Sequence, residues 1–285
     1  MRLGKYDTSN IRVRSGGRGL PGGRAGGIGC GTIIIAAIAY FLFGADPMQT
    51  IGAIQGAQQS VPQTQQASGM SEDEVCNSGP YALEACNALS SLNDTWRPEF
   101  QRAGIRFQDP MLTLYSGAVR TQGCGSASSA AGPFYCPADM GIYIDTSFYD
   151  EMAQRMGAGG DFARYYVMAH EYGHHIQNLT GLAAQVRSAQ AQDRRRANQL
   201  QVRMELQADC YAGVWAGKNR NLIERGDMEE GLRAASSIGD DTLMRRAGQR
   251  INPENFTHGT SQQRMEALRL GMERANDTVC DRYFQ

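Results

Sequence analysis

The apolar positions between residues 161 and 179 recur at the spacing of an amphipathic helix. Because a helix repeats every 3.6 residues, one face would carry Phe162, Tyr165, Tyr166, Ala169, Gly173 and Ile176. Asp161 after Gly159-Gly160 is typical of a helix start, and Gly181 offers a stop. The pattern therefore predicts a helix of about five turns over residues 161–179.

Other segments show helical patterning as well. They cover residues 81–92, about 93–104, 148–156, 197–217 and 260–275. Ser71-Glu72-Asp73-Glu74 has the spacing of a capping box and is predicted to open the folded part. The polar stretch 182–196 is interpreted as a solvated helix face, whose arginines need no partner beyond water.

Between residues 111 and 145 the pattern changes to that of β-strands. Residues 111–119 and 141–145 carry β-forming side chains, and the small polar residues 123–132 between them indicate a loop. Together these elements predict an α+β domain, mostly helical with a small sheet, over residues 72–285.

The start of the chain has a different composition. Residues 1–27 carry six basic residues against one acidic residue, are rich in glycine and show no hydrophobic period, which predicts a disordered tail. Residues 28–45 are uncharged and mostly apolar, and they are interpreted as one transmembrane anchor at the short limit of a span. Residues 46–71, rich in Gln, Ala, Gly and Ser, are predicted to form a flexible linker.

The basic residues before the anchor predict its orientation. Arginine-rich flanks stay in the cytoplasm, so residues 1–27 would be cytoplasmic and residues 72–285 would lie across the membrane. A buried helix fits the polar flanks poorly. A cleaved signal peptide is the other alternative, although no small-x-small cleavage site follows Phe43. The anchor already explains the basic tail, and the net charge of the chain is −1, so no nucleic-acid partner is expected.

Cysteine usage supports an exported domain. The predicted domain contains an even number of cysteines, which would pair in an oxidising compartment. The simplest interpretation joins neighbours, giving the pairs Cys76–Cys86, Cys124–Cys136 and Cys210–Cys280. Reduced core thiols are the alternative. A four-cysteine zinc site is not expected, because the chain has no C-x-x-C pair.

The candidate chemistry centres on His170-Glu171-x-x-His174 in the predicted helix 161–179. Imidazoles four residues apart lie on one helix face and can reach a single ion, of which zinc is the commonest. Glu171 would lie beside that ion, where a carboxylate can take a proton from attacking water. One lone histidine would more simply be a core residue, but three of the four histidines lie within six consecutive residues. His175 is expected to point off the metal face.

A tetrahedral zinc site needs a third protein ligand. Thr180 stands where another class of zinc peptidase has a histidine, so we expect a glutamate from a following helix, and Glu205 supplies it. Asp209, one turn later, would orient a ligand histidine through its second nitrogen. Two carboxylates in an otherwise apolar stretch are costly to bury without such a role. The alternative is an exposed acidic face matched to the arginines upstream.

Several motifs together resemble the bacterial neutral zinc metallopeptidases, a family of membrane-anchored periplasmic enzymes. These motifs are H-E-Y-G-H-H-I-Q at 170–177, E-L-Q-A-D-C-Y-A-G at 205–213, P-F-Y-C-P-A-D at 133–139, I-Y-I-D at 142–145, and T-H-G-T-S at 257–261 with Arg264. The resemblance covers nearly the whole chain, including its basic start. It implies a zincin-like, gluzincin-like fold, a Zn²⁺ cofactor and hydrolysis of peptide bonds in the periplasm.

The resemblance also suggests roles for other segments. In zinc peptidases of this kind a sheet edge beside the metal helix receives the substrate as an added strand. Residues 111–145 could supply that edge, or they could form a structural hairpin closed by Cys124 and Cys136. A histidine, tyrosine or arginine donates a hydrogen bond to the oxyanion. We assign this catalytic role to His258, with Arg264 and Tyr211 as further candidates and a helix-cap or loop role as the alternative for His258.

These inferences predict a zinc-dependent endopeptidase that is anchored to the inner membrane and acts on peptides or proteins. His170, His174 and Glu205 would hold the metal, Asp209 would support a ligand and Glu171 would be the general base. The main alternative is a non-catalytic, zinc-stabilised envelope module that binds a partner protein, in which Glu171 would be dispensable. A zinc hydrolase acting on non-peptide amides is the other alternative.

Overall fold

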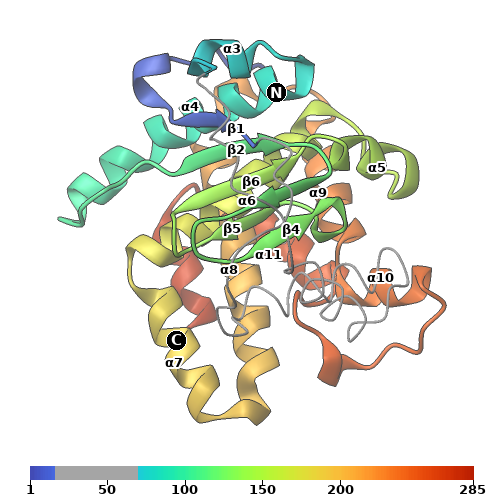
Figure 1. Ribbon diagram of the computed structural model, residues 1–285. Coiled ribbons are helices and arrows are strands. Elements are labelled where there is room, and N and C mark those ends of the chain that lie inside the picture. Colours follow the sequence, from blue (N-terminus) through green and yellow to red (C-terminus); the bar gives the residue numbers. More distant parts are fainter. Residues whose placement is uncertain (17–69) are drawn as a thin grey trace, which may run out of the picture.

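The computed structural model describes residues 1–16 and 70–285 (Figure 1). The predicted anchor at 28–45 and all but the last two residues of the predicted linker at 46–71 lie outside this part of the chain. None of the helices within the described residues is long and apolar enough to cross a membrane.

A mixed sheet of β1 (Val13–Ser15), β2 (Met111–Tyr115), β6 (Gly141–Asp145) and β5 (Phe134–Cys136), in that order, forms one layer of the molecule. Strands β1, β2 and β6 run parallel, whereas β5 is antiparallel to β6 and forms the outer edge. All five residues of β6 are buried. A separate hairpin contains β3 (Ala118–Arg120) and β4 (Ser126–Ser128), because Gly117, with a φ of 89°, ends the strand predicted over 111–119.

The α-helices confirm the predicted class, α+β and mostly helical with a small sheet. Their bounds are α3 Glu72–Cys76, α4 Pro80–Arg102, α5 Phe148–Arg155, α6 Asp161–Leu179, α7 Leu182–Gln192, α8 Ala197–Lys218, α9 Asp227–Ser237, α10 Asp240–Arg246 and α11 Ser261–Arg274. Short 3₁₀ segments are η1 Thr8–Asn10, η2 Ser129–Ala131, η3 Arg194–Arg196, η4 Arg220–Leu222, η5 Pro253–Asn255 and η6 Asp277–Tyr283. The predicted capping box at Ser71 is present.

The prediction of two separate helices over residues 81–104 was wrong. The segments 81–92 and 93–104 form the single helix α4, which continues through Pro98. Leu89, Leu92, Trp96 and Phe100 are buried at helical spacing on both sides of this point. A continuous buried face therefore holds the helix together where proline removes a backbone donor.

The predicted disordered tail at 1–27 is wrong for residues 1–16. Strand β1 pairs with β2, with Val13 opposite Leu112, and the side chains of Met1, Tyr6 and Ile11 are also buried. The amino group of Met1 lies 2.9 Å from a carboxylate oxygen of Asp227. A few apolar residues scattered among polar ones give no periodic signal, because their partners come from distant parts of the sequence.

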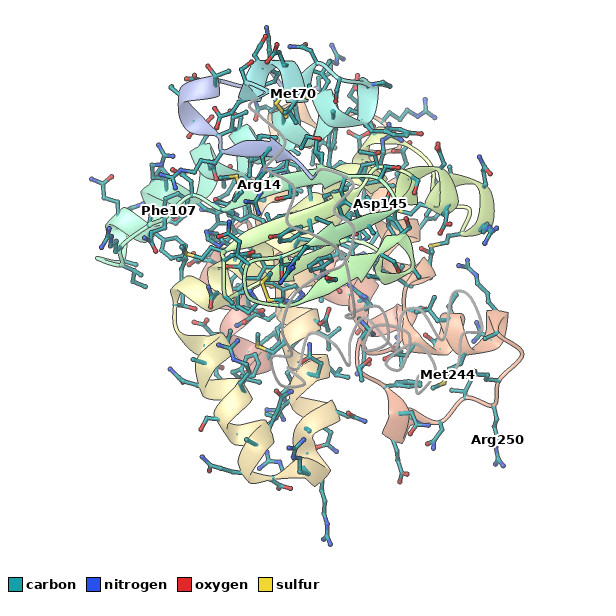
Figure 2. The ribbon with its side chains drawn as sticks, viewed as in Figure 1. Arg14, Met70, Phe107, Asp145, Met244 and Arg250 are labelled. Carbon is teal, nitrogen blue, oxygen red and sulfur yellow. A yellow bond between two sulfur atoms is a disulfide. The ribbon has the colours of Figure 1, made fainter. Side chains whose placement is uncertain are left out.

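This packing also bears on the predicted membrane orientation. Residues 1–16 share a hydrophobic core and a sheet with residues 70–285. Figure 2 shows Arg14 at the sheet, where it donates to Thr113 and Tyr143. Both described parts therefore form one folded unit in this structure. The predicted orientation, with the N-terminus inside and the domain outside, stays a prediction, and it would require these two parts to separate across the membrane.

Close helix contacts bring α6, α8 and α11 together beneath the sheet (Figure 1). A Cβ atom at Gly173 of α6 would lie 2.8 Å from the Cα of Ala208 in α8, and one at Gly271 of α11 would lie 2.1 Å from a carbonyl oxygen of α8. Only residues without a Cβ allow such a close approach. These glycines therefore set the spacing on which the side-chain arrangement below depends.

The three predicted disulfides are confirmed. The bonded pairs are Cys76–Cys86, Cys124–Cys136 and Cys210–Cys280, with Cα–Cα distances of 5.9, 5.9 and 5.7 Å. The third ties η6, at the end of the chain, to the middle of α8. Its long loop makes it the bond expected to constrain the unfolded chain most.

Candidate active site

Three predicted ligand residues meet between α6 and α8. His170 and His174 project from the same face of α6, and Glu205 projects from α8. The distance from Glu205 Oε2 to His170 Nε2 is 3.1 Å, and the distance to His174 Nε2 is 3.5 Å. One donor atom from each residue lies within 4.8 Å of the other two. Two imidazoles and a carboxylate at this spacing fit the donor set of a zinc ion with one position left for water.

Each residue of this candidate ligand cluster, His170, His174 and Glu205, is oriented by a further hydrogen bond. The Nδ1 of His170 lies 2.7 Å from Asp209 Oδ1, as predicted for Asp209. The Nδ1 of His174 donates to Gln177 Oε1, because the amide nitrogen of Gln177 already donates to the backbone of Met204. The second oxygen of Glu205 accepts from Gln201. These bonds leave both Nε2 atoms directed at Glu205, which is the arrangement that metal ligands need.

Arg264 lies behind this cluster. Its guanidinium donates to both oxygens of Asp209 at 2.8 and 3.0 Å and to Tyr166 Oη at 3.2 Å, and its side chain is 1% exposed. Arg264 was an oxyanion candidate, but the structure engages it with Asp209 instead. Although burial opposes ionisation of Asp209, Arg264 and His170 hold the pKa of its carboxyl at about 2.

Glu171 has no hydrogen-bond partner among the residues that the structure describes. Its carboxylate is largely buried, and it forms no hydrogen bond with the residues that the structure describes. Burial raises its pKa, opposed by the nearby His170 and His174. A desolvated carboxylate beside the ligand cluster suits general base chemistry, which requires a pKa closer to neutral than that of an exposed glutamate.

His258 approaches the cluster from the loop before α11. Asp240 holds this loop, since its Oδ2 accepts from the backbone nitrogens of Thr257, His258 and Gly259, and its Oδ1 lies 3.2 Å from His258 Nδ1. The next residue, Gly259, lies against α8 beside Glu205, since a Cβ there would be 3.2 Å from Val202 and 3.5 Å from Leu206. Sequence reasoning found His258 but missed Asp240.

Tyr211 lies elsewhere. Its ring packs edge to face on Trp96, with 5.5 Å between the ring centroids. Burial raises the pKa of its hydroxyl, and the charges of Asp281 and Asp277 in η6 raise it further. The structure therefore does not bring this oxyanion candidate to the ligand cluster.

His175 faces away from the cluster, as expected, and holds the sheet edge. Its Nε2–H donates to the backbone oxygen of Gln108, and its Nδ1 accepts from Tyr135 of β5 at 2.9 Å. Burial lowers the pKa of His175 to about 4, so the ring is neutral at physiological pH. Asn178 of α6 also bonds Tyr135. These bonds fix β5, an antiparallel edge strand, against the helix that carries the ligands.

The carboxylate and the histidines stabilise each other's charged forms. Burial disfavours the ionised Glu205, but His174 and His170 outweigh it and hold its pKa well below the usual value. Burial likewise opposes protonation of His170, yet Asp209 and Glu205 raise its pKa to about 9. A divalent cation would take the place of these protons at the histidine nitrogens.

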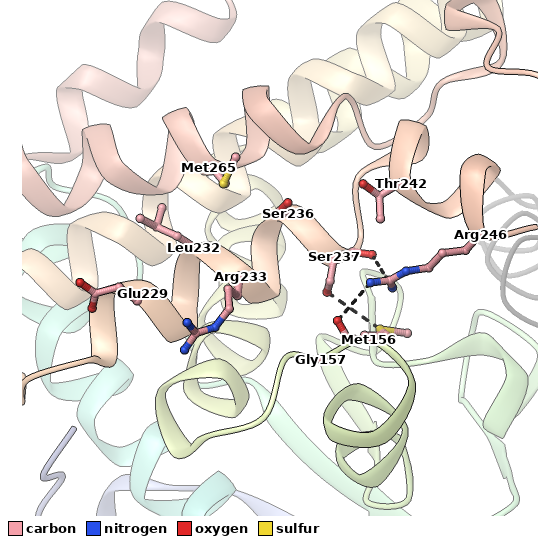
Figure 3. A pocket seen from close by; sticks show the side chains of 10 residues that line it. All are labelled: Met156, Gly157, Glu229, Leu232, Arg233, Ser236, Ser237, Thr242, Arg246 and Met265. Atoms are coloured by element: carbon pink, nitrogen blue, oxygen red, sulfur yellow. Dashed lines mark hydrogen bonds between the residues drawn. The ribbon is translucent and has the colours of Figure 1, made fainter.

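A separate cavity of about 430 Å³ lies between the end of α5, α9, α10 and α11 (Figure 3). Arg246 crosses one side of it and donates to the backbone oxygens of Ser237 and Met156. None of the ligand residues lines this cavity. It therefore has no part in the metal site.

The family and relatives that this chain resembles are consistent with two histidines and a glutamate as zinc ligands. The family model described as "Putative neutral zinc metallopeptidase" matches residues 3–283. The uncharacterized protein YpfJ of Escherichia coli strain K12 is 41% identical over 293 residues, covering 98% of this chain and 97% of the relative. The uncharacterized protein Rv2575 of Mycobacterium tuberculosis strain H37Rv is 38% identical over 207 residues, covering 68% of each.

No solved structure gives a significant match, so the zincin-like fold stays a prediction. The family match extends over both described parts of the chain and includes the ligand helix, the Glu205 helix and the His258 loop. The chain therefore belongs to the neutral zinc metallopeptidase family.

Proposed function

We propose that the protein is a zinc-dependent endopeptidase with His170, His174 and Glu205 as metal ligands and Glu171 as general base. The observation that carries this proposal is the state of Glu171. Glu171 is 8% exposed, and its carboxylate bonds to no other group in the described chain, so it has no structural use while its partial desolvation costs free energy. Its position beside a two-histidine, one-glutamate cluster gives it a chemical use.

Zinc, when bound, would polarise water and lower its pKa from about 15.7 toward 7. Glu171 accepts the proton that the attacking water loses, and it returns this proton to the amine that leaves. Burial raises the pKa of Glu171, which brings it closer to neutral, where one carboxyl can both accept and return a proton.

His258 is proposed to stabilise the negative charge that develops on the carbonyl oxygen. Asp240 holds the ring through Nδ1 and holds the backbone of the loop through three N–H groups. This leaves Nε2 as the ring atom available to a substrate. A preorganised donor of this kind acts without reorganising during the reaction.

Strand β5 is the proposed binding edge for an extended substrate. It is one of the two edge strands of the four-stranded sheet, opposite β1, and Tyr135 fixes it to α6 through His175 and Asn178. Pairing along a strand edge uses backbone groups of the substrate and therefore tolerates many sequences. This supports cleavage within extended or unfolded polypeptides.

We also propose that the domain works outside the cytoplasm, attached to the membrane. Three disulfides support export, because such bonds persist in oxidising compartments. Attachment through residues 28–45 rests on their apolar sequence alone.

The test is hydrolysis of a fluorescently labelled unfolded protein by the purified full chain, with Glu171→Gln beside it. We expect both proteins to bind one equivalent of zinc and only the wild type to cut, with a loss of several orders of magnitude in the variant. Glu273→Gln, at an exposed position of α11, is the matched control and should keep full activity.

Equal cleavage by Glu171→Gln would overturn the proposed role of Glu171. Zinc binding by both proteins with no cleavage of unfolded proteins or of peptide libraries would favour the non-catalytic binding module.

A further inference from the structure

Helices α7 and α8 form a hairpin that projects from the body of the molecule (Figure 1). The turn at its tip is η3, which consists of Arg194, Arg195 and Arg196. The two helices are held together by apolar contacts, with Ala183, Val186 and Met204 buried between them. The hairpin is thus a packed projection and not a loose loop.

The tip carries unpaired positive charge. Arg194, Arg195, Arg196 and Arg203 are all exposed, and none of them forms an ion pair or hydrogen bond through its side chain with any residue of 1–16 or 70–285. Asp193 is the one acidic residue between 182 and 204, and its carboxylate is engaged by the backbone N–H of Arg195. One further acidic residue lies nearby, because Asn198 donates to the backbone oxygen of Glu254 in η5, but the four arginines outnumber Asp193 and Glu254 and the tip keeps a net positive charge.

This charge does not serve the fold. Like charges on adjacent residues repel each other, and these side chains pack on no part of the core. In contrast, the buried Arg264 and the half-buried Arg164 each pair with a carboxylate. Unlike single exposed arginines that water alone can solvate, the three consecutive arginines of the tip are grouped on one projection and are free to meet an external anionic partner.

We propose that the tip of the α7–α8 hairpin binds the surface of an anionic phospholipid membrane. A convex projection with several basic side chains fits a flat, negatively charged surface, where each basic residue contributes independently. Nucleic acid fits less well, because residues 182–203 contain no aromatic side chain on which a base could stack. An acidic protein fits less well, because the tip has no aromatic or large apolar anchor of the kind that dominates protein interfaces.

This placement has a consequence for the metal site. Glu205 follows Arg196 by nine residues along α8. At 1.5 Å per helical residue the ligand cluster would lie roughly 14 Å from the tip, and therefore close to the membrane surface. The proposal itself does not depend on hydrolysis.

The test measures binding of the purified full chain to vesicles by co-sedimentation. One set of vesicles contains phosphatidylcholine alone, and the other contains phosphatidylcholine with phosphatidylglycerol. We expect tighter binding to the anionic vesicles, weakened by salt, and a loss of this preference of roughly 100-fold in the triple variant Arg194→Gln, Arg195→Gln, Arg196→Gln.

A second triple variant, which also removes three positive charges, is the matched control. Arg225→Gln, Arg269→Gln and Arg282→Gln alter exposed arginines that also lack ion pairs within the described residues, and this variant should keep the preference. The ratio of the affinities for the two vesicle types is used, because any general attraction of residues 28–45 for lipid affects both affinities and cancels in the ratio. Equal binding to both vesicle types, equal losses in both variants, or tighter binding of a single-stranded oligonucleotide than of anionic vesicles would each overturn the proposal.

Discussion

His258 depends on Asp240 for its position at the candidate site. The ring and the loop that carries it are both held by this one buried carboxylate. His258→Gln should therefore lower kcat by about 10²–10³ if Nε2 donates to the oxyanion, because that is the usual loss for one such donor. The KM of this variant should change little, because the oxyanion forms only in the transition state.

Zinc content separates this role from a structural one. His258 bonds to none of the three ligand residues, so His258→Gln should retain its zinc. Loss of zinc together with activity would contradict the assignment and make His258 a support of the ligand cluster.

The metal-free ligand cluster should respond to pH in a specific direction. Asp209 and Glu205 raise the pKa of His170 to about 9 against the opposing effect of burial. A raised pKa stabilises the folded state fully below the unfolded value, near 6.5, and this contribution is lost as the pH rises through 9. We therefore expect the Tm of metal-free protein to fall between pH 6.5 and 9.

Zinc should reverse this trend. Protons compete with the ion for the histidine nitrogens, so the increase in Tm on adding zinc should grow over the same pH range. Thermal melts with and without zinc at several pH values measure both effects. Asp209→Asn is the control, which should flatten the slope of the metal-free protein. A metal-free Tm that rises between pH 6.5 and 9 would rule the explanation out.

Residues of the site differ in how far sequence reveals them. His170 and His174 follow from spacing within one helix, and Glu205 with Asp209 followed from two carboxylates in an apolar stretch. Gln177 lies one turn after His174, so the same helical spacing could have revealed it. Asp240 could not be found in this way, because it meets His258 only through tertiary packing across 18 residues.

At the scale of elements, the ligand cluster depends on how closely α6 approaches α8. Gly173 lies between the two ligand histidines, where a Cβ would come within 2.8 Å of Ala208. Gly173→Ala should push the helices apart and cost about 1–3 kcal/mol of stability, despite the better helix propensity of alanine. It should also weaken zinc binding, because Glu205 moves with α8.

Unfolding by urea and zinc titration of the same variant measure the two effects. Gly79→Ala is the matched control, since its added methyl group would meet no atom within 4 Å. Full stability and unchanged zinc affinity in Gly173→Ala would show that the helix spacing is not set by this glycine.

The elements that sequence predicted correctly are those with a strong local signal. The bounds of α6 and β6 follow directly from hydrophobic spacing and β-forming residues. Strand β5 was missed because it has three residues, too few to show a period, and gains its position from His175 and Asn178. Its role as the outer edge follows from the pairing order, which local sequence does not encode.

At the scale of the whole molecule, residues 1–16 and 70–285 form one folded unit. Strand β1 completes the sheet. The amino group of Met1 donates a hydrogen bond to Asp161, the first residue of α6. Sequence predicted opposite sides of a membrane for these parts, because the charge of the tail was weighed without knowledge of its packing. In the structure the two parts pack together.

Cysteine labelling in intact Escherichia coli cells tests whether the two parts also pack together in the cell. Thr8→Cys and Gln185→Cys place thiols at exposed positions of the first segment and of the domain, each in a background with Cys30→Ser. Because the two parts pack together, a membrane-impermeant maleimide should label both positions to a similar extent or neither, and export of the disulfide-bonded domain favours both. Lysed cells, in which both thiols are accessible, give the reference for full labelling. Labelling of Gln185→Cys alone would contradict the packing of β1 on β2 in the cell and would restore the orientation that the basic residues predict.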